Sequence, residues 1–173
     1  MLLINKNELV KALTVLSRVA PGKNSTMDVL KCVRLQTVNR QAVSLSVSNL
    51  DEYFSCKINV SDAPDGLDVL LPIAEVRAWL KGKNRSLLEV KPLDNGGVSL
   101  SELTGTQEVK KEFPAPEAKD FPSMPFPTGL SAMPKDFIRT LNQIAPSISD
   151  KDSRLALHGI LLSKDGLVAT DGK

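Results

Sequence analysis

Two different spacings of apolar residues run along the first 113 residues and predict a mixture of helices and strands. One helix is predicted from Asn7 to about Val19, where Asn5 and Glu8 form a capping box. A second helix is predicted to begin at Pro72 and to end near Lys81. The apolar stripes that support these helices recur every three or four residues and consist of Leu9, Leu13, Leu16 and Ala20 in the first and Ile73, Val76, Trp79 and Leu80 in the second.

Short apolar or alternating runs separated by Gly, Pro, Asn and Asp predict a set of strands. They cover residues 1–4, 32–37, 43–48, 52–60, 68–71, 87–90, 98–103 and 106–113. Helices combined with this many strands predict an α+β fold. Cys32 and Cys56 fall in two of the strands, and we expect both to be buried free thiols because no further cysteines could complete a disulfide framework or a metal site.

Five prolines between residues 114 and 128 argue against a regular helix or a central strand in that segment. The segment is therefore predicted to be a linker or a connection wrapped around the first domain, with a domain boundary near residue 125. We divide the chain into a first domain, 1–124, and an incomplete second domain, 125–173.

The order helix, strand, strand occurs twice along the chain. Residues 6–16 match 134–144 at a shift of 128, residues 30–35 match 157–162 at a shift of 127, and residues 45–49 match 167–171 at a shift of 122. Apolar matches are common between any two amphipathic helices, so the pattern alone leaves coincidence open. If the repeat is real, the second copy contains only the first half of the repeated fold.

Composition restricts the protein class without deciding the function. The 173 residues are 42% hydrophobic and 24% charged, and no apolar run approaches the roughly 18 residues that span a bilayer. The first residues contain an early acid and lack the apolar region of a signal peptide, so we expect a cytoplasmic protein without membrane partners.

Positive charge is concentrated in the helical windows. Residues 6–23 contain four cations and one acid, and residues 73–85 contain the same. Pairs of cations lie two turns or one turn apart on a predicted helix face: Lys11 with Arg18, Arg77 with Lys81, and Lys135 with Arg139. Such faces are suited to phosphate contacts without sequence readout. Alternatively, these side chains simply solvate surface helices.

Motifs for catalysis are absent from the sequence. There is no glycine-rich phosphate loop, zinc-binding spacing or nucleophile elbow. The one histidine, His158, lies in a predicted apolar strand and is interpreted as a packed or surface residue instead of a catalytic base. The run Asp150-Lys151-Asp152 is interpreted as a solvated charged loop. We therefore expect a non-enzymatic protein without cofactors.

Several segments resemble the bacterial DNA polymerase III beta subunit, the DNA sliding clamp, and the resemblance extends over the whole chain. The most specific piece is Val168-Ala169-Thr170-Asp171-Gly172, which follows the run Arg154-Leu155-Ala156-Leu157-His158-Gly159-Ile160-Leu161-Leu162. The other matching segments are Leu9–Arg18, Ser25–Leu30, Ser48-Asn49-Leu50-Asp51, Leu71-Pro72 and Asp120-Phe121-Pro122.

The resemblance implies a DNA-clamp fold, in which helices cover one face of curved antiparallel sheets. It implies a ring of two chains with three such domains each, through which duplex DNA passes, and partners that include DNA polymerase and clamp-loader subunits. The DNA-contacting residues implied here are Lys11, Arg18, Lys23, Asn24, Arg77, Lys81, Lys135 and Arg139. The residues implied in the partner-peptide groove are Leu157, Thr170, Gly172 and Lys173.

The sequence departs from the clamp pattern in a few places. Asn24 stands near a position where clamps can carry Arg, and Lys173 stands where they usually have His. Leu155 and Ala156 replace residues that are often aromatic. The strand 106–113, which meets the other subunit in clamps, carries Lys and Glu that are typical of a protected sheet edge.

Two further functions therefore stay open beside the processivity clamp. One is a truncated clamp-like interaction module that binds a clamp loader or another clamp without encircling DNA. The other is an unrelated small α+β enzyme, which would require an organised pocket with a perturbed titrating residue.

Overall fold

The chain divides into two compact units, residues 1–125 and 126–173, and each is described by itself. The computed structural model describes residues 2–21, 25–81, 87–94, 96–104, 107–123, 132–149 and 151–172. Lys23, Asn24 and Lys173, which the sequence assigns to functional sites, lie outside the described residues.

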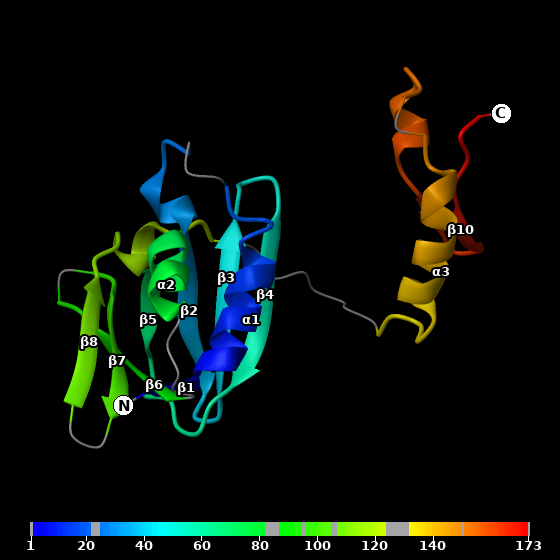
Figure 1. Cartoon of the computed structure of the whole chain (residues 1–173). Helices are drawn as coiled ribbons and strands as arrows, with labels where there is room; N and C mark the ends of the chain where they lie inside the picture. Colours follow the sequence, from blue (N-terminus) through cyan, green and yellow to red (C-terminus); the bar gives the residue numbers. More distant parts are fainter. Residues whose placement is uncertain are drawn as a thin grey trace. The chain divides into compact units, whose positions relative to one another are not determined.

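The first unit contains two α-helices, eight strands and two short 3-10 helices among its described residues (Figure 1). In chain order the elements are β1 (Leu2–Asn5), α1 (Lys6–Leu16), η1 (Asp28–Lys31), β2 (Cys32–Asn39), β3 (Ala42–Ser48), β4 (Tyr53–Asn59), β5 (Asp68–Pro72), α2 (Ile73–Leu80), β6 (Leu87–Pro92), β7 (Val98–Thr104), β8 (Gln107–Phe113) and η2 (Ala118–Asp120). The predicted helices and strands are confirmed to within a few residues.

Helix α1 begins where the sequence predicts and ends earlier. The side chain of Asn5 accepts a hydrogen bond of 2.9 Å from the backbone N–H of Asn7, as an N-cap does. The predicted helix reached Val19, but α1 ends at Leu16. The following residues tighten into turns, in which the N–H groups of Ser17 and Ala20 reach back to Leu13 and Leu16.

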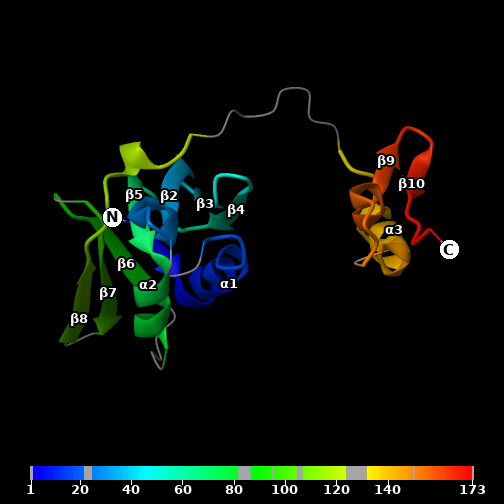
Figure 2. The ribbon, with the colours of Figure 1, turned by 90° about the horizontal axis from the view of Figure 1, so that it is seen from above.

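Two antiparallel four-stranded sheets form the body of the unit, with strand orders β1-β6-β7-β8 and β4-β3-β2-β5. Figure 2 shows α1 and α2 side by side against them. Alternate residues of each strand face the helices because the side-chain period of a strand is two. The buried side chains that fill the core include Leu9, Leu13 and Leu16 of α1, Val76 and Leu80 of α2, and Leu35, Leu45, Leu71, Leu88 and Leu100 of the strands.

A smaller cluster covers the outer face of the second sheet and fixes the start of the proline-rich connection. Phe121, which is 3% exposed, packs there against Val29, Leu30 and Leu70. The Arg34 guanidinium lies 5.8 Å from the centre of the Phe121 ring and binds the carboxylate of Asp68 through Nε and Nη2 at 2.8 and 2.6 Å. This part of the connection is therefore wrapped on the first unit.

The second unit contains α3 (Phe137–Ile144), η3 (Ala145–Ser147), η4 (Leu155–His158) and a hairpin of β9 (Leu161–Ser163) and β10 (Gly166–Val168). His158 belongs to η4, so the prediction that it lies in a strand is wrong. The side chain is exposed, and its Nε2 lies 2.6 Å from the backbone oxygen of Asp152.

The internal repeat predicted from the sequence is present in the backbone. Helix η1 maps onto η4 at the predicted shift of 127, and α1 and α3 end at positions that differ by the predicted 128. The turn after β3 recurs after β10. The N–H of Leu50 donates to Ser48 Oγ at 3.0 Å, and the N–H of Gly172 donates to Thr170 Oγ1 at 3.1 Å. The φ angles of Leu50 and Gly172 are +80° and +77°.

Leu50 is the one non-glycine residue with a positive φ in the part of the chain that the structure describes. A side chain in this region costs about 1–2 kcal/mol, and glycine recovers part of that cost. Leu50 is 62% exposed, so little packing is lost when the side chain is removed. We expect Leu50→Gly to raise the free energy of unfolding by about 1 kcal/mol. Chemical denaturation measures the change, and Leu50→Ala, which keeps Cβ, should give no comparable gain.

Candidate functional site

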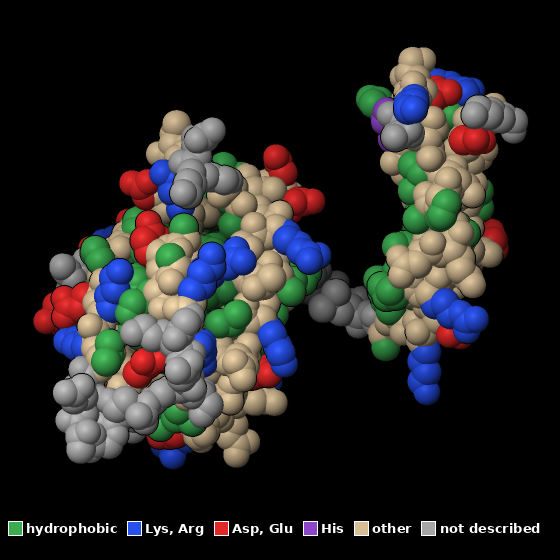
Figure 3. Space-filling view, in the orientation of Figure 1, with side chains coloured by type: hydrophobic (Ala, Val, Ile, Leu, Met, Phe, Trp, Pro, Cys, Tyr) green, Lys and Arg blue, Asp and Glu red, His purple; other side chains and the backbone are tan. Residues whose placement is uncertain are grey.

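The predicted cations of the first unit gather on the outer side of its two helices. Lys11 lies on α1, Arg18 follows α1, Arg77 lies on α2 and Lys81 caps α2. Lys11, Arg18 and Lys81 are exposed, and Arg77 is half-buried. Figure 3 shows Lys and Arg side chains across the face formed by the two helices. The opposite faces of both helices are apolar and buried, so the cationic side chains project toward solvent.

One contact joins the charges of the two helices into a single face. The Arg77 guanidinium donates a hydrogen bond of 2.8 Å from Nη1 to Ser17 Oγ at the end of α1. This contact ties a cation of α2 to the end of α1, one residue before Arg18 in the chain. Lys11 pairs with Glu8 at 3.3 Å, but both side chains are at least half exposed, so the pair is weak and leaves the charge accessible.

A hollow of about 450 Å³ separates the end of α1 from the start of α2. It is lined by Ser17, Ala20, Pro21, Lys31, Ile73, Ala74, Glu75 and Arg77. Its polar wall carries Lys31, Arg77 and Glu75. The Ser17 hydroxyl also lines it, where it accepts from Arg77 and donates to the backbone oxygen of Thr14. The hollow therefore extends the cationic face.

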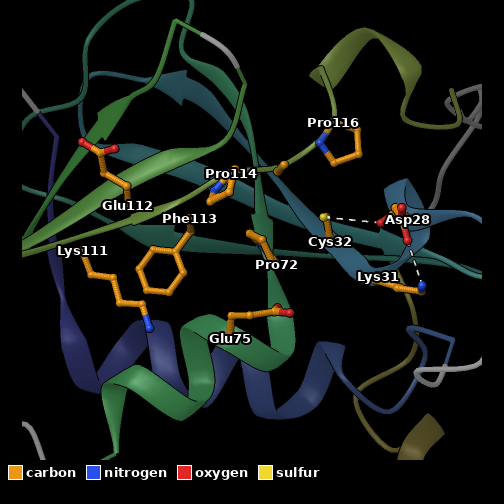
Figure 4. A pocket seen from close by; sticks show the side chains of 11 residues that line it. Asp28, Lys31, Cys32, Pro72, Glu75, Lys111, Glu112, Phe113, Pro114 and Pro116 are labelled. Carbon is orange, nitrogen blue, oxygen red and sulfur yellow. Dashed lines mark hydrogen bonds and ion pairs between the residues drawn. The ribbon is translucent and has the colours of Figure 1, made fainter.

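A second hollow, of about 470 Å³, lies between β8, the end of β5 and the first turn of α2 (Figure 4). The Phe113 ring lies at its side, with Lys111 Nζ 5.3 Å from the ring centre and Trp79 edge-on at 5.8 Å between ring centres. Cys32 also lines it, and its thiol reaches the backbone oxygen of Asp28 at 3.6 Å. Burial is the main cause that raises the pKa of Cys32 from 9.0 to about 12, and the carboxylates of Glu75 and Asp28 add to it.

A thiol with this pKa stays protonated at neutral pH and is a poor nucleophile. The predicted burial is confirmed for Cys32, while Cys56 is partly buried. Both cysteines are free thiols, as predicted. Among the described residues, no three His, Cys, Asp or Glu side chains are grouped so that they could hold a metal ion. None of the described helices is long and apolar enough to cross a bilayer.

The second unit brings together three of the residues assigned to the peptide groove. The backbone N–H of Gly172 donates a hydrogen bond to Thr170 Oγ1, and a Cβ placed on Gly172 would lie 3.0 Å from Leu157 Cδ1. Leu157 is half-buried, and Thr170 and Gly172 are exposed. Lys135 and Arg139 also belong to this unit, and both are exposed. Arg139 lies on α3, but Lys135 precedes the helix, so the prediction that the two lie one turn apart on a helix face is wrong.

Two residues beside this turn were missed as site residues by the sequence analysis. Arg154 binds Asp152 through Nε at 2.9 Å and Nη2 at 2.8 Å, and its guanidinium lies over Gly172. The Arg154 side-chain bond, followed by its backbone bond, lowers the pKa of Asp152 from 3.8 to about 2. Asp152 is thus the ion-pair partner of Arg154 within the charged loop.

No protein-family model matches the sequence, and no match exists among curated protein sequences. Solved structures do match the fold. The DNA polymerase III subunit beta of Pseudomonas aeruginosa is similar with a TM-score of 0.72 and 23% identity, over 98% of this chain and 46% of that one. The beta clamp of Helicobacter pylori bound to a DNA ligase peptide matches with a TM-score of 0.79 and 19% identity, over 99% of this chain and 49% of that one. The beta subunit from DNA polymerase of Streptococcus pyogenes matches with a TM-score of 0.75 and 21% identity, over 98% of this chain and 47% of that one.

The chain therefore has the fold of DNA sliding clamps, and it spans about half the length of the clamps that it matches. The predicted α+β clamp fold is confirmed, with helices on one face of antiparallel sheets.

The shifted thiol pKa makes stability depend on pH. Above about pH 9 the unfolded chain releases the Cys32 proton while the folded chain retains it until about pH 12. The unfolded state then binds fewer protons, so stability falls as pH rises through this window. We expect Cys32→Ala to reduce the loss of unfolding free energy between about pH 8 and pH 10.5. Denaturant unfolding at both pH values measures it.

The matched control is Cys56→Ala. Burial also raises the pKa of Cys56, but this thiol is more exposed than Cys32. Its removal should change the pH dependence less. If Cys32→Ala loses as much unfolding free energy between the two pH values as the wild type, the prediction is contradicted. The substitution also leaves a small cavity that lowers stability equally at both pH values, and this loss does not bear on the prediction.

Proposed function

We propose that this chain is part of a DNA sliding clamp, a processivity factor that tethers the replicative polymerase to duplex DNA. The observation that carries the proposal is the single cationic face that the Arg77–Ser17 contact makes from two helices of the clamp fold. Lys11, Arg18, Arg77 and Lys81 are the phosphate-contacting residues of this face.

The chemistry of the face suits sliding better than sequence recognition. Long, solvated cations on a helix surface neutralise phosphates, and phosphates look the same at every base pair. No aromatic side chain or recognition helix accompanies them among the described residues of α1 and α2 on this side. Contacts of this kind are weak individually and exchange readily along the duplex. We assign Lys23, Asn24, Lys135 and Arg139 as further DNA contacts.

The second unit is proposed to be the first half of a second clamp domain, with the first domain ending at residue 124. Its turn at Leu157, Thr170 and Gly172, with Lys173, forms one part of a groove for partner peptides. Support comes from the geometry of the turn and from the Helicobacter pylori clamp of the same fold, which was solved with a DNA ligase peptide. The proposed partners are DNA polymerase and clamp-loader subunits, and the proposed assembly is a ring.

A clamp-like interaction module that does not encircle DNA is the second candidate function. The observation that favours it is the free edge of the first sheet. Strand β8 is an outer strand, and Lys110, Lys111 and Glu112 on it are exposed, with a Lys110–Glu112 pair at 3.1 Å. Charged edge strands resist pairing with another sheet. Sedimentation of the chain tests this edge, because pairing of two chains through β8 gives a dimer and a protected edge leaves a monomer.

Salt dependence tests the DNA face directly. We expect the chain to bind a short duplex with a dissociation constant of about 10⁻⁴ to 10⁻⁶ M at physiological salt, without sequence preference. Arg18→Gln and Lys81→Gln should each reduce the slope of log K against log salt concentration by about 0.9, because each removes one phosphate contact. Fluorescence anisotropy over a salt series measures the slopes.

Lys57→Gln is the matched control. Lys57 is exposed on β4 next to Cys56, which packs on the core, so Lys57 lies on the sheet face away from α1. The substitution removes the same charge and should leave the slope unchanged. An equal effect of Lys57→Gln, or tight sequence-specific binding by the wild type, contradicts the proposed DNA face.

A further inference from the structure

The turn proposed for peptide docking is held by a carboxylate that makes several directed bonds. Asp152 Oδ1 accepts from Arg154 Nε at 2.9 Å and from the Arg154 backbone N–H at 2.8 Å, and Oδ2 accepts from Nη2 at 2.8 Å. The backbone of Asp152 is fixed as well, because its N–H donates to Ser149 Oγ at 3.1 Å and its oxygen meets His158 Nε2 at 2.6 Å. The carboxylate is therefore a fixed support and differs from a mobile surface ion pair.

The guanidinium that it supports lies where a side chain of residue 172 would be. A Cβ built on Gly172 would come within 2.5 Å of Arg154 Nη2 and 3.0 Å of Leu157 Cδ1. Gly172 also has φ +77°, which favours glycine independently of the space. Arg154 is 63% exposed and Asp152 is 21% exposed, so the cation lines the surface while its support lies beneath it.

We propose that Asp152 is a positioning residue for peptide binding: it holds the Arg154 guanidinium across Gly172, so that this cation forms the wall of the groove beside Leu157. The inference rests on the proposed function of the turn. An apolar side chain of a docking peptide that reaches Leu157 meets the flat guanidinium at its side.

The corresponding positions in the first copy of the repeat support this assignment. Met27 matches Arg154, and Leu50 matches Gly172, at the shifts of 127 and 122. There the turn has the same hydrogen bond and the same φ, but no ion pair and no glycine. The fold of the turn therefore does not require the Asp152–Arg154 pair, and the pair adds a property that only the second unit has.

The test is Asp152→Asn in the complete 173-residue chain, with Asp165→Asn as the matched control. Asp165 is exposed in the β9–β10 turn, so its substitution makes the same charge change away from the groove. The first readout is the NMR signal of the Arg154 Nε–H group, which a bidentate carboxylate protects from exchange. The second is titration with the DNA ligase peptide of the Helicobacter pylori complex, followed at the Leu157 methyl groups.

We expect Asp152→Asn to remove the protection of Arg154 Nε–H and to weaken peptide binding by about three- to tenfold, the effect of releasing one long side chain at a binding surface. Asp165→Asn should change neither readout. Arg154→Lys keeps the charge without the planar fork and should weaken binding as much as Asp152→Asn. Combining the two substitutions should weaken binding no further, since both remove one positioned group.

The outcomes separate this inference from the function on which it rests. If the wild type binds the peptide and Asp152→Asn binds equally well, the positioning role is wrong while the groove stands. If the wild type gives no peptide-dependent shift, the groove itself is wrong, and the positioning role is wrong with it. Backbone amide signals of the β9–β10 hairpin verify that the variant is folded, and if Asp152→Asn loses them, Arg154→Lys decides the question.

Discussion

The first unit depends on the burial of one apolar stripe of α1 between the two sheets. Leu9, Leu13 and Leu16 are fully buried, and burial of each such side chain contributes about 1.5–3 kcal/mol. An α-helix with one face fixed in this way has no rotational freedom left, so Lys11 is held on the solvent side, and the exposed Arg18 follows in the turn after the helix. The same argument applies to α2, where buried Val76 and Leu80 determine where Arg77 and Lys81 lie. The cationic face is thus a consequence of core packing.

The two copies of the repeat show how one backbone template acquires different surfaces. The turn after β3 and the turn after β10 share a hydroxyl-to-N–H hydrogen bond and a left-handed third residue. That third residue is Leu50 in the first copy, with an exposed side chain, and Gly172 in the second, beneath a guanidinium. The left-handed backbone strains Leu50 because it carries a Cβ, whereas Gly172 has no Cβ to strain. One residue therefore replaces a projecting apolar side chain by a glycine that lies beside Leu157 and Arg154.

Most of the fold followed from the sequence because periodicity is a local property. The strands β2 and β3 and the helix α1 were predicted within a few residues because their apolar positions recur with a clear period. The errors fall where local pattern and local structure separate. The segment around His158 has an apolar run of strand length but forms the 3-10 helix η4, and the repeat that aligns it with η1 was the signal that could have shown this.

The candidate site was less predictable because its contacts depend on chain reversal. Asp152 was predicted in a charged loop and Arg154 at the start of an apolar run, and no periodicity assigns partners to residues of a loop. The backbone turn at Asp152 brings the two side chains together. Leu50 at a positive φ was equally hidden, since leucine rarely adopts it, although its alignment with Gly172 carried the information.

The two proposed binding surfaces place different demands on their side chains. A phosphate contact in a sliding protein needs charge near the duplex and little fixed geometry, so Lys and Arg are close to equivalent at positions 11, 18 and 81. A groove wall needs a defined shape, and only the planar guanidinium with its paired donors fits the carboxylate of Asp152. The cations of α1 and α2 should therefore tolerate exchange between Lys and Arg, whereas Arg154 should not. This contrast follows from the bonds each cation makes, because Arg154 is fixed at two nitrogen atoms by one carboxylate and Lys11 has a single exposed partner.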